Sequence, residues 1–164
     1  MIFETERLIV RKLTVNDLAS FHNLESNPNV LRFADGEVKS LRENKKELSL
    51  LINKYDILDN DFWIYAIDRK TDSIFIGTVA FVKDDKDDEI GYRFIEDFWG
   101  KGYGLEICNG ILKYAKLIGK NKLIGYVVED NVASLKILEK VGFKKVNTFT
   151  NKENQKEIKY QIKL

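Results

Sequence analysis

The feature that most constrains this chain is the glycine-rich stretch Trp99–Gly104, which joins a strand-like run to an amphipathic helical pattern. Gly100, Gly102 and Gly104 stand at alternate positions. Glycines there leave the backbone open to a ligand and permit positive φ values that turn several N–H groups toward one point. The helix that follows adds unpaired N–H groups and the positive end of its dipole. We expect a pyrophosphate to bind here, with a tight strand-to-helix turn as the alternative.

Two well-known phosphate loops fit this stretch poorly. A P-loop requires Ser or Thr after its lysine, but Lys101 is followed by Gly102. A dinucleotide-binding loop requires Gly or Ala three residues after its second glycine, and that position is Leu105. The missing glycine weakens the interpretation as a nicotinamide-dependent enzyme. That interpretation is not excluded, because the acidic Glu129 follows the next expected strand.

Two motifs resemble those of the GNAT N-acetyltransferases, whose pattern Gln/Arg-x-x-Gly-x-Gly/Ala cradles the pyrophosphate of coenzyme A. Gly102 and Gly104 fill the last two places, and Trp99 stands where Gln or Arg is usual. The run Phe98–Glu106 is similar to the Trp-Gly-Lys-Gly-Tyr-Ala-Thr-Glu version in the branch that includes RimJ and RimL, the ribosomal-protein alanine acetyltransferases. A later motif resembles that branch's Asn-x-x-Ser-x-x-x-Leu-Glu-Lys-x-Gly-Phe signature, through Asn131, Ser134, Leu138, Glu139, Lys140, Gly142 and Phe143.

The composition is that of one globular domain spanning residues 1–164. Hydrophobic residues make up 44% and charged residues 32%, and the net charge of +1 argues against a nucleic-acid partner. With Cys108 and His22 as its only cysteine and histidine, the chain offers no disulfide, no catalytic triad and no obvious metal site. We assign His22 to a helix surface and Cys108 to the core. The start lacks a signal-peptide pattern and no run approaches the ~18 apolar residues of a membrane span, so we expect a cytoplasmic protein without a membrane partner.

The patterns predict alternating strands and helices. Thr14 with Asp17, and Ser40 with Glu43, are capping pairs that predict helix starts. The Asn27-Pro28-Asn29 run predicts a turn, and Ala34-Asp35-Gly36 a second one. We expect strands at 8–13, 62–67, 74–82, 89–95, 123–128, 143–149 and 157–162, and a hairpin tip at 84–88. The helix after the glycines should bury Leu105, Cys108, Leu112, Ala115 and Ile118, which lie three or four residues apart.

The resemblance implies a GNAT-like α/β fold (α+β mixed). Its central sheet is mixed, mostly antiparallel and twisted, with about seven strands flanked by about four helices. It also implies acetyl-CoA as acyl donor, with no metal. Carried over position by position, the residues implied to bind the cofactor are Tyr92, Phe94, Ile95, Gly100, Lys101, Gly102, Tyr103, Gly104 and Asn131.

The implied reaction is direct attack of a primary amine on the thioester, which needs no nucleophilic side chain. Glu89 lies where several family members carry a catalytic glutamate, and we take it as the candidate general base. Ser134 is the candidate general acid by resemblance, because no tyrosine lies between Asn131 and Gly142. The structural alternatives are that Glu89 is only the first solvated residue after a hairpin, and that Asn131 and Ser134 are helix-start residues that satisfy backbone donors.

The acceptor is an amine of unknown identity: a peptide N-terminus, a polyamine, an amino acid or a drug. Phe33 and Trp63 are candidate acceptor-binding residues. A homodimer is plausible from the family. A non-catalytic acyl-CoA-binding sensor or interaction module is the second interpretation, since Trp99 replaces Gln or Arg and the usual catalytic tyrosine is missing.

Overall fold

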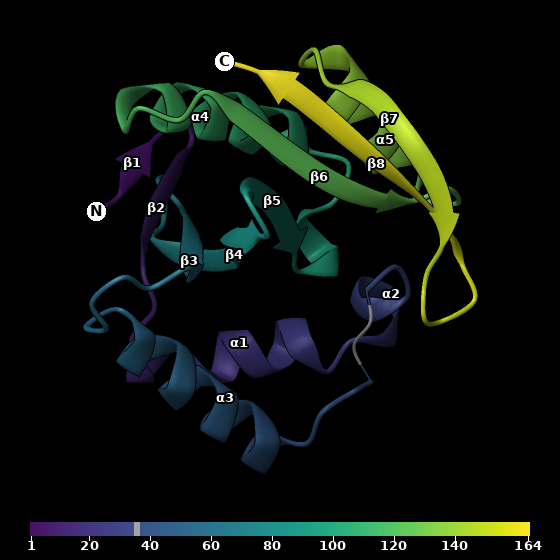
Figure 1. The fold of residues 1–164 in the computed structure, drawn as a ribbon. Coiled ribbons are helices and arrows are strands. Elements are labelled where there is room, and N and C mark those ends of the chain that lie inside the picture. Colours follow the sequence, from purple (N-terminus) through teal and green to yellow (C-terminus); the bar gives the residue numbers. More distant parts are fainter. Residues whose placement is uncertain (35–36) are drawn as a thin grey trace.

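One mixed sheet forms the centre of the molecule. A computed structural model describes residues 1–34 and 37–164, and its strands lie in the order β1-β2-β3-β4-β5-β6-β8-β7 (Figure 1). All neighbouring strands are antiparallel except β5 and β6, which run parallel. The strands are β1 (Phe3–Glu4), β2 (Leu8–Lys12), β3 (Phe62–Arg69), β4 (Ile74–Asp84), β5 (Asp87–Phe94), β6 (Lys122–Val128), β7 (Lys144–Thr150) and β8 (Lys156–Lys163).

Helices cover both faces of this sheet (Figure 1). They are α1 (Leu18–Glu25), α2 (Pro28–Leu31), α3 (Leu41–Lys54), α4 (Tyr103–Leu117) and α5 (Val132–Lys140), with 3₁₀ turns at Val15–Asp17 and Glu96–Phe98. The predicted fold class is confirmed. The estimate of about seven strands and four helices omitted β1, which is two residues long, and α2, which is a single turn.

Two hydrophobic cores lie on the two faces of the sheet. The larger one packs α4 and α5 against the sheet and includes Ile107, Ile111 and Leu138. The smaller one packs α1 and α3 against the other face and includes Phe21 and Leu48. Burial on both faces explains why the central strands read as continuous apolar runs.

Local sequence signals account for most helix boundaries. Both capping boxes form, Thr14 with Asp17 and Ser40 with Glu43. The predicted turn at Asn27-Pro28 is instead the start of α2, because proline is favoured at the first helical position and the Asn27 side chain accepts a hydrogen bond from the Asn29 amide at 2.8 Å. The second predicted turn falls partly on residues 35 and 36, which lie outside the described residues.

The buried face of α4 differs from the prediction. Cys108 and Ala115 are fully buried as expected, but Leu105 and Leu112 are only half-buried and Ile118 is 45% exposed. The predicted stripe is rotated around the helix axis relative to the buried face. Consecutive apolar residues in α4 point in different directions, so their spacing does not show which of them face the sheet. The buried residues of the helix are Tyr103, Ile107, Cys108, Gly110, Ile111 and Ala115.

Two other local assignments also change. Asp87 and Asp88 belong to β5 rather than to a solvated hairpin tip, because Lys122 pairs with Asp87, and Lys120 pairs with Asp88 at 2.9 Å. His22 is half-buried rather than a plain surface residue. Its Nδ1 lies 2.9 Å from the Nδ2 atom of the fully buried Asn44, so it contributes to the contact between α1 and α3.

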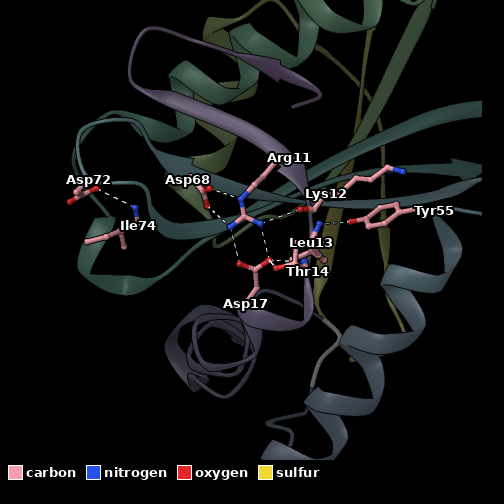
Figure 2. Close-up of polar contacts among 9 residues, drawn as sticks. All are labelled: Arg11, Lys12, Leu13, Thr14, Asp17, Tyr55, Asp68, Asp72 and Ile74. Atoms are coloured by element: carbon pink, nitrogen blue, oxygen red, sulfur yellow. Dashed lines mark hydrogen bonds and ion pairs between the residues drawn. The ribbon is translucent and has the colours of Figure 1, made fainter.

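A buried ion cluster fixes the corner between β2 and α1 (Figure 2). The Arg11 guanidinium donates to both carboxylate oxygens of Asp17 at 2.8 Å and to Asp68 at 2.5 and 2.9 Å. Both carboxylates are buried, with the residues 7% and 8% exposed. Burial alone would raise the pKa of Asp17, but its hydrogen bonds with Arg11 and Thr14 outweigh burial and lower the pKa.

Candidate active site

The site begins where the sheet opens between β5 and β6. These two parallel strands pair at Glu89 and Ile124 alone among the described residues. Each is paired along its other edge, β5 with β4 and β6 with β8. Beyond Glu89, the edge of β5 that faces β6 therefore forms no ladder with β6 in the described residues, which leaves room there for a ligand to meet the backbone.

A cleft of about 1520 Å³ runs along this opening. Its walls include residues of α1, α2, α3, β3, β4, β5, β6 and β7, together with the start of α4, the start of α5 and the loop between β7 and β8. Most of the residues selected from the sequence line it together. They are Phe33, Glu89, Tyr92, Phe94, Gly100, Gly102, Tyr103, Gly104, Asn131 and Ser134.

Three selected residues do not line the cleft. Ile95 is buried in the smaller core. The Lys101 ammonium donates to the Asp97 carbonyl oxygen at 2.7 Å, across the turn that precedes the glycines. Trp63 lines a separate cavity with Tyr65 and packs in parallel with it, so the structure does not bring it to the cleft.

The glycine-rich loop has the open backbone that a phosphate site needs. Gly100 and Gly102 have φ values of +71° and +80°. A Cβ atom built at Gly100 would meet nothing within 4 Å, and one at Gly102 would meet only the Arg7 guanidinium at 3.5 Å. Gly104 serves packing instead, because a Cβ there would lie 2.8 Å from Ile137 on α5. The first two glycines therefore leave space for a ligand, and the third allows α4 and α5 to approach.

Trp99 secures the loop from within the cleft. Its indole Nε1 donates to the Phe94 carbonyl oxygen at 2.8 Å, which ties the loop to the end of β5. A tryptophan in the place of the usual Gln or Arg thus acts on the backbone geometry of the loop.

An anchor that the sequence analysis missed holds the loop from the outside. Glu106, in the first turn of α4, accepts hydrogen bonds from the Thr5 hydroxyl at 2.5 Å, the Arg7 amide at 2.7 Å and Arg7 Nε at 2.6 Å. Arg7 also donates to the Lys101 carbonyl oxygen at 3.0 Å, and its guanidinium lies 4.6 Å from the centroid of the Tyr103 ring. Nothing in the sequence connects residues about one hundred positions apart, so this anchor required the fold.

The bonds to Glu106 also set its charge. Burial alone would raise the pKa of its carboxyl, but the hydrogen bonds from Thr5 and Arg7 outweigh burial and lower the pKa. Glu106 is therefore a structural anion facing Arg7.

The two candidate catalytic residues lie on different walls. Glu89 is half-buried at the closed end of the opening, where β5 and β6 pair. Ser134 lies in the first turn of α5, and the Asn131 side chain caps this helix by accepting from the Ser134 amide at 3.2 Å. Asn131 therefore caps α5, as its structural alternative expected. This cap holds the backbone of Ser134 and leaves the Ser134 hydroxyl able to turn.

The opposite wall of the cleft carries charge. Arg93 Nη1 donates to both oxygens of the Glu25 carboxylate, at 3.1 and 3.0 Å, which pins α1 against β5. Acidic side chains outnumber basic ones among the described residues that line the cleft, and they include Glu25, Glu89 and Asp130. Such a lining favours the approach of a cationic amine.

The cleft has features that suit acetyl-CoA. The open loop at Gly100 and Gly102 and the start of α4 fit a pyrophosphate, and the free edge of β5 fits an amide-bearing arm. In the described part of the chain, no group of three or more His, Cys, Asp or Glu side chains is placed to hold a metal ion. No helix in that part is long and apolar enough to cross a membrane.

Comparison with known proteins identifies clear relatives. A family described as "Acetyltransferase (GNAT) domain" matches residues 7–144. YoaA of Bacillus subtilis, an uncharacterized N-acetyltransferase, is 29% identical over 149 residues, covering 88% of this chain and 83% of its own. A GNAT-family acetyltransferase from Bacillus anthracis superposes with a TM-score of 0.86 at 22% identity, over 98% of this chain and 97% of that one. RimL, a ribosomal L7/L12 α-N-protein acetyltransferase solved with coenzyme A, superposes with a TM-score of 0.84 at 18% identity, over 98% and 96%.

Proposed function

Because the chain belongs to the GNAT acetyltransferase family and is therefore an acetyl-CoA-dependent N-acetyltransferase, we propose that its acceptor is the α-amine at the N-terminus of a peptide or protein. Family membership favours catalysis over the non-catalytic sensor, and the GNAT match leaves the nicotinamide interpretation without support. The observation that carries the proposal is the opening between β5 and β6, with Glu89 at its closed end. RimL is named for this kind of acceptor.

Acetyl-CoA supplies the acetyl group as a reactive thioester. In this proposal the backbone at Gly100, Gly102 and Tyr103 holds the pyrophosphate together with the positive end of α4. The free edge of β5 near Tyr92 and Phe94 holds the pantetheine arm. The cleft walls exclude most of the surrounding water and present the acceptor amine to the opening.

Glu89 acts as the general base, directly or through one water. The attacking amine must be neutral, and this requirement favours an α-amine. At pH 7 an α-amine with a pKa of ~8 gives up its proton for about 1 to 1.5 kcal/mol, whereas a lysine side chain requires roughly 4 to 5 kcal/mol. A single half-buried carboxylate suffices to deprotonate an α-amine and is a weak base for a lysine side chain.

The test compares amines in one assay. We would supply acetyl-CoA with a lysine-free peptide that begins with Ala or Ser, an N-terminally blocked peptide that contains lysine, and spermidine. The proposal predicts the highest kcat/KM for the free N-terminus, with the acetyl group located on that residue by mass spectrometry. Preferential acetylation of the lysine or of spermidine would contradict the acceptor assignment while leaving the acetyltransferase activity intact. The homodimer and the cytoplasmic location remain predictions, the first of which sedimentation would check.

A further inference from the structure

The Tyr92 hydroxyl is buried without a hydrogen-bond partner among the described residues. A buried polar group left unpaired costs roughly 1 to 3 kcal/mol, and native proteins contain few of them. The resemblance implied that Tyr92 binds the cofactor, which leaves the pairing of its hydroxyl unexplained. Its unpaired hydroxyl therefore needs a separate explanation.

The hydroxyl lies where β5, α4 and α5 meet. A Cβ atom at Gly104, in the first turn of α4, would be 3.6 Å from the Tyr92 oxygen. The side chains of Ser134 and Cys108 are close enough to influence the pKa of Tyr92, although neither meets its hydroxyl with hydrogen-bond geometry. Burial raises the pKa of Tyr92 far above its ordinary value, so this phenol remains a neutral O–H donor at any physiological pH.

Of the two neighbours, Ser134 is the better acceptor. The Cys108 side chain is fully buried, and burial raises the pKa of its thiol to about 12, so it stays a neutral thiol with a weakly accepting sulfur. Ser134 lines the cleft and is half-buried, and its hydroxyl can turn because only its backbone is held by the Asn131 cap.

We propose that, when acetyl-CoA binds, the Ser134 side chain turns so that the Tyr92 hydroxyl donates a hydrogen bond to Ser134 Oγ and holds the Ser134 O–H as a donor toward the thioester sulfur. The inference rests on the proposed function and makes the Tyr92 side chain a positioning residue. Two hydroxyls in series polarise one another, which strengthens the outer donor.

In this arrangement neither hydroxyl gives up its proton, so Ser134 acts as a hydrogen-bond donor in place of the general acid that the resemblance implied. As the N–C bond forms and the C–S bond breaks, the electron pair of the C–S bond stays on sulfur. Ser134 stabilises that developing charge by hydrogen bonding, water in the cleft supplies the proton of the departing thiol, and the proton of the amine passes to Glu89 or its water. The two residues therefore act by preorganised electrostatics.

The test begins with Tyr92→Phe, which deletes only the unpaired hydroxyl. Because no bond is lost in the free protein, its melting temperature should stay the same or rise, and its affinity for coenzyme A should be unchanged. The kcat value should fall by about tenfold or more, as expected when a donor in the active site loses its orientation. Ser134→Ala should lower kcat at least as much, and the double variant should be no slower than Ser134→Ala, because the two residues act through one contact.

Tyr55→Phe is the matched control. The Tyr55 hydroxyl accepts from the Leu13 amide at 2.9 Å and lies outside the cleft, so this variant should lose melting temperature and keep its kcat. The inference is overturned if Tyr92→Phe lowers the melting temperature, keeps the wild-type kcat, or adds its full effect to that of Ser134→Ala. Absence of turnover by the wild-type protein with every amine would instead overturn the proposed function on which the inference rests.

Discussion

At the scale of single residues, three carboxylates of this chain lie in three different surroundings. Glu106 is held by hydrogen bonds from Thr5 and Arg7 and is an anchor. Asp17 shares the Arg11 guanidinium and is a structural ion. Glu89 lines the cleft at the opening of the sheet, where we propose that it acts as a general base. The sequence predicts the cap at Asp17 and implies the base role of Glu89 by resemblance, but the Arg11 contacts of Asp17 and the Arg7 contacts of Glu106 depend on the fold.

The base role of Glu89 predicts a pH-dependent defect. Glu89→Gln should lower kcat by roughly 10²-fold or more at pH 7, because a general base contributes ~10² to 10⁴-fold. The deficit should shrink toward pH 9.5, since an α-amine with a pKa of ~8 is by then neutral without help. Steady-state rates from pH 6.5 to 9.5 measure this, with Asp130→Asn in the same cleft as a control that keeps the wild-type profile. A deficit that is constant across this range would exclude the base role.

The Arg11 cluster predicts how stability depends on pH. The pKa of Asp17 is lowered in the folded state, so its contribution is fully present above the unfolded pKa of ~3.9 and is lost as pH falls through the lower folded value. Arg11→Met leaves two buried carboxylates unpaired and should lower the free energy of unfolding by about 3 to 5 kcal/mol at pH 7. Urea unfolding at pH 7 and pH 3.5 should show a smaller loss at the lower pH, where protonation removes the buried charge. An equal loss at both values would contradict this account.

At the scale of elements, the position of β5 depends on one close approach. A Cβ atom at Gly77 on β4 would lie 2.1 Å from the Arg93 carbonyl oxygen on β5, and this backbone atom cannot rotate away. At Gly91 on β5 the nearest atom to a Cβ is Ala80 Cβ at 3.8 Å, an ordinary contact. Gly77 is therefore required for the ladder that holds one side of the opening.

This contrast gives a matched pair of variants within one sheet. Gly77→Ala should lower the free energy of unfolding by about 1 to 3 kcal/mol or more, as overpacking does. Gly91→Ala should be neutral or slightly stabilising, because it removes only conformational freedom from the unfolded chain. Urea unfolding of the two variants measures both values. Similar stabilities would show that β4 and β5 can separate without cost.

Elements with a strong local signal were predictable, and those defined by tertiary contacts were not. The capping boxes at Thr14 and Ser40 formed as predicted, because their hydrogen bonds lie within a few residues. The buried stripe of α4 was predicted in part, since a nearly continuous apolar helix does not reveal which side faces the sheet. The Arg7 to Glu106 anchor and the place of Trp63 depend on which segments meet, and periodicity carries no information on that.

At the scale of the whole molecule, the sheet consists of two well-paired parts that separate along one seam. Strands β1 to β5 form one part and β6, β8 and β7 the other, with cores on both faces (Figure 1). Because β5 is hydrogen-bonded to β4 and β6 to β8, the seam between β5 and β6 can stay open without breaking a ladder within either part. The cleft is thus a property of the topology, and the residues that line it come from nearly the full length of the chain.

The central claim is that this seam and its glycine-rich loop bind acetyl-CoA, and calorimetric titration of acetyl-CoA tests it most directly. Asparagine tolerates positive φ better than other residues with a side chain, so Gly102→Asn and Gly119→Asn should fold alike, with φ values of +80° and +77° at the two sites. Gly119 lies outside the cleft, whereas Gly102 lines it. We expect the wild type and Gly119→Asn to bind acetyl-CoA equally well, and Gly102→Asn to bind it at least about tenfold more weakly. A factor of ten corresponds to about 1.4 kcal/mol, which the loss of one phosphate contact accounts for. None of the three proteins should bind NAD. Equal binding by all three proteins, or no binding by the wild type at millimolar acetyl-CoA, would contradict the account.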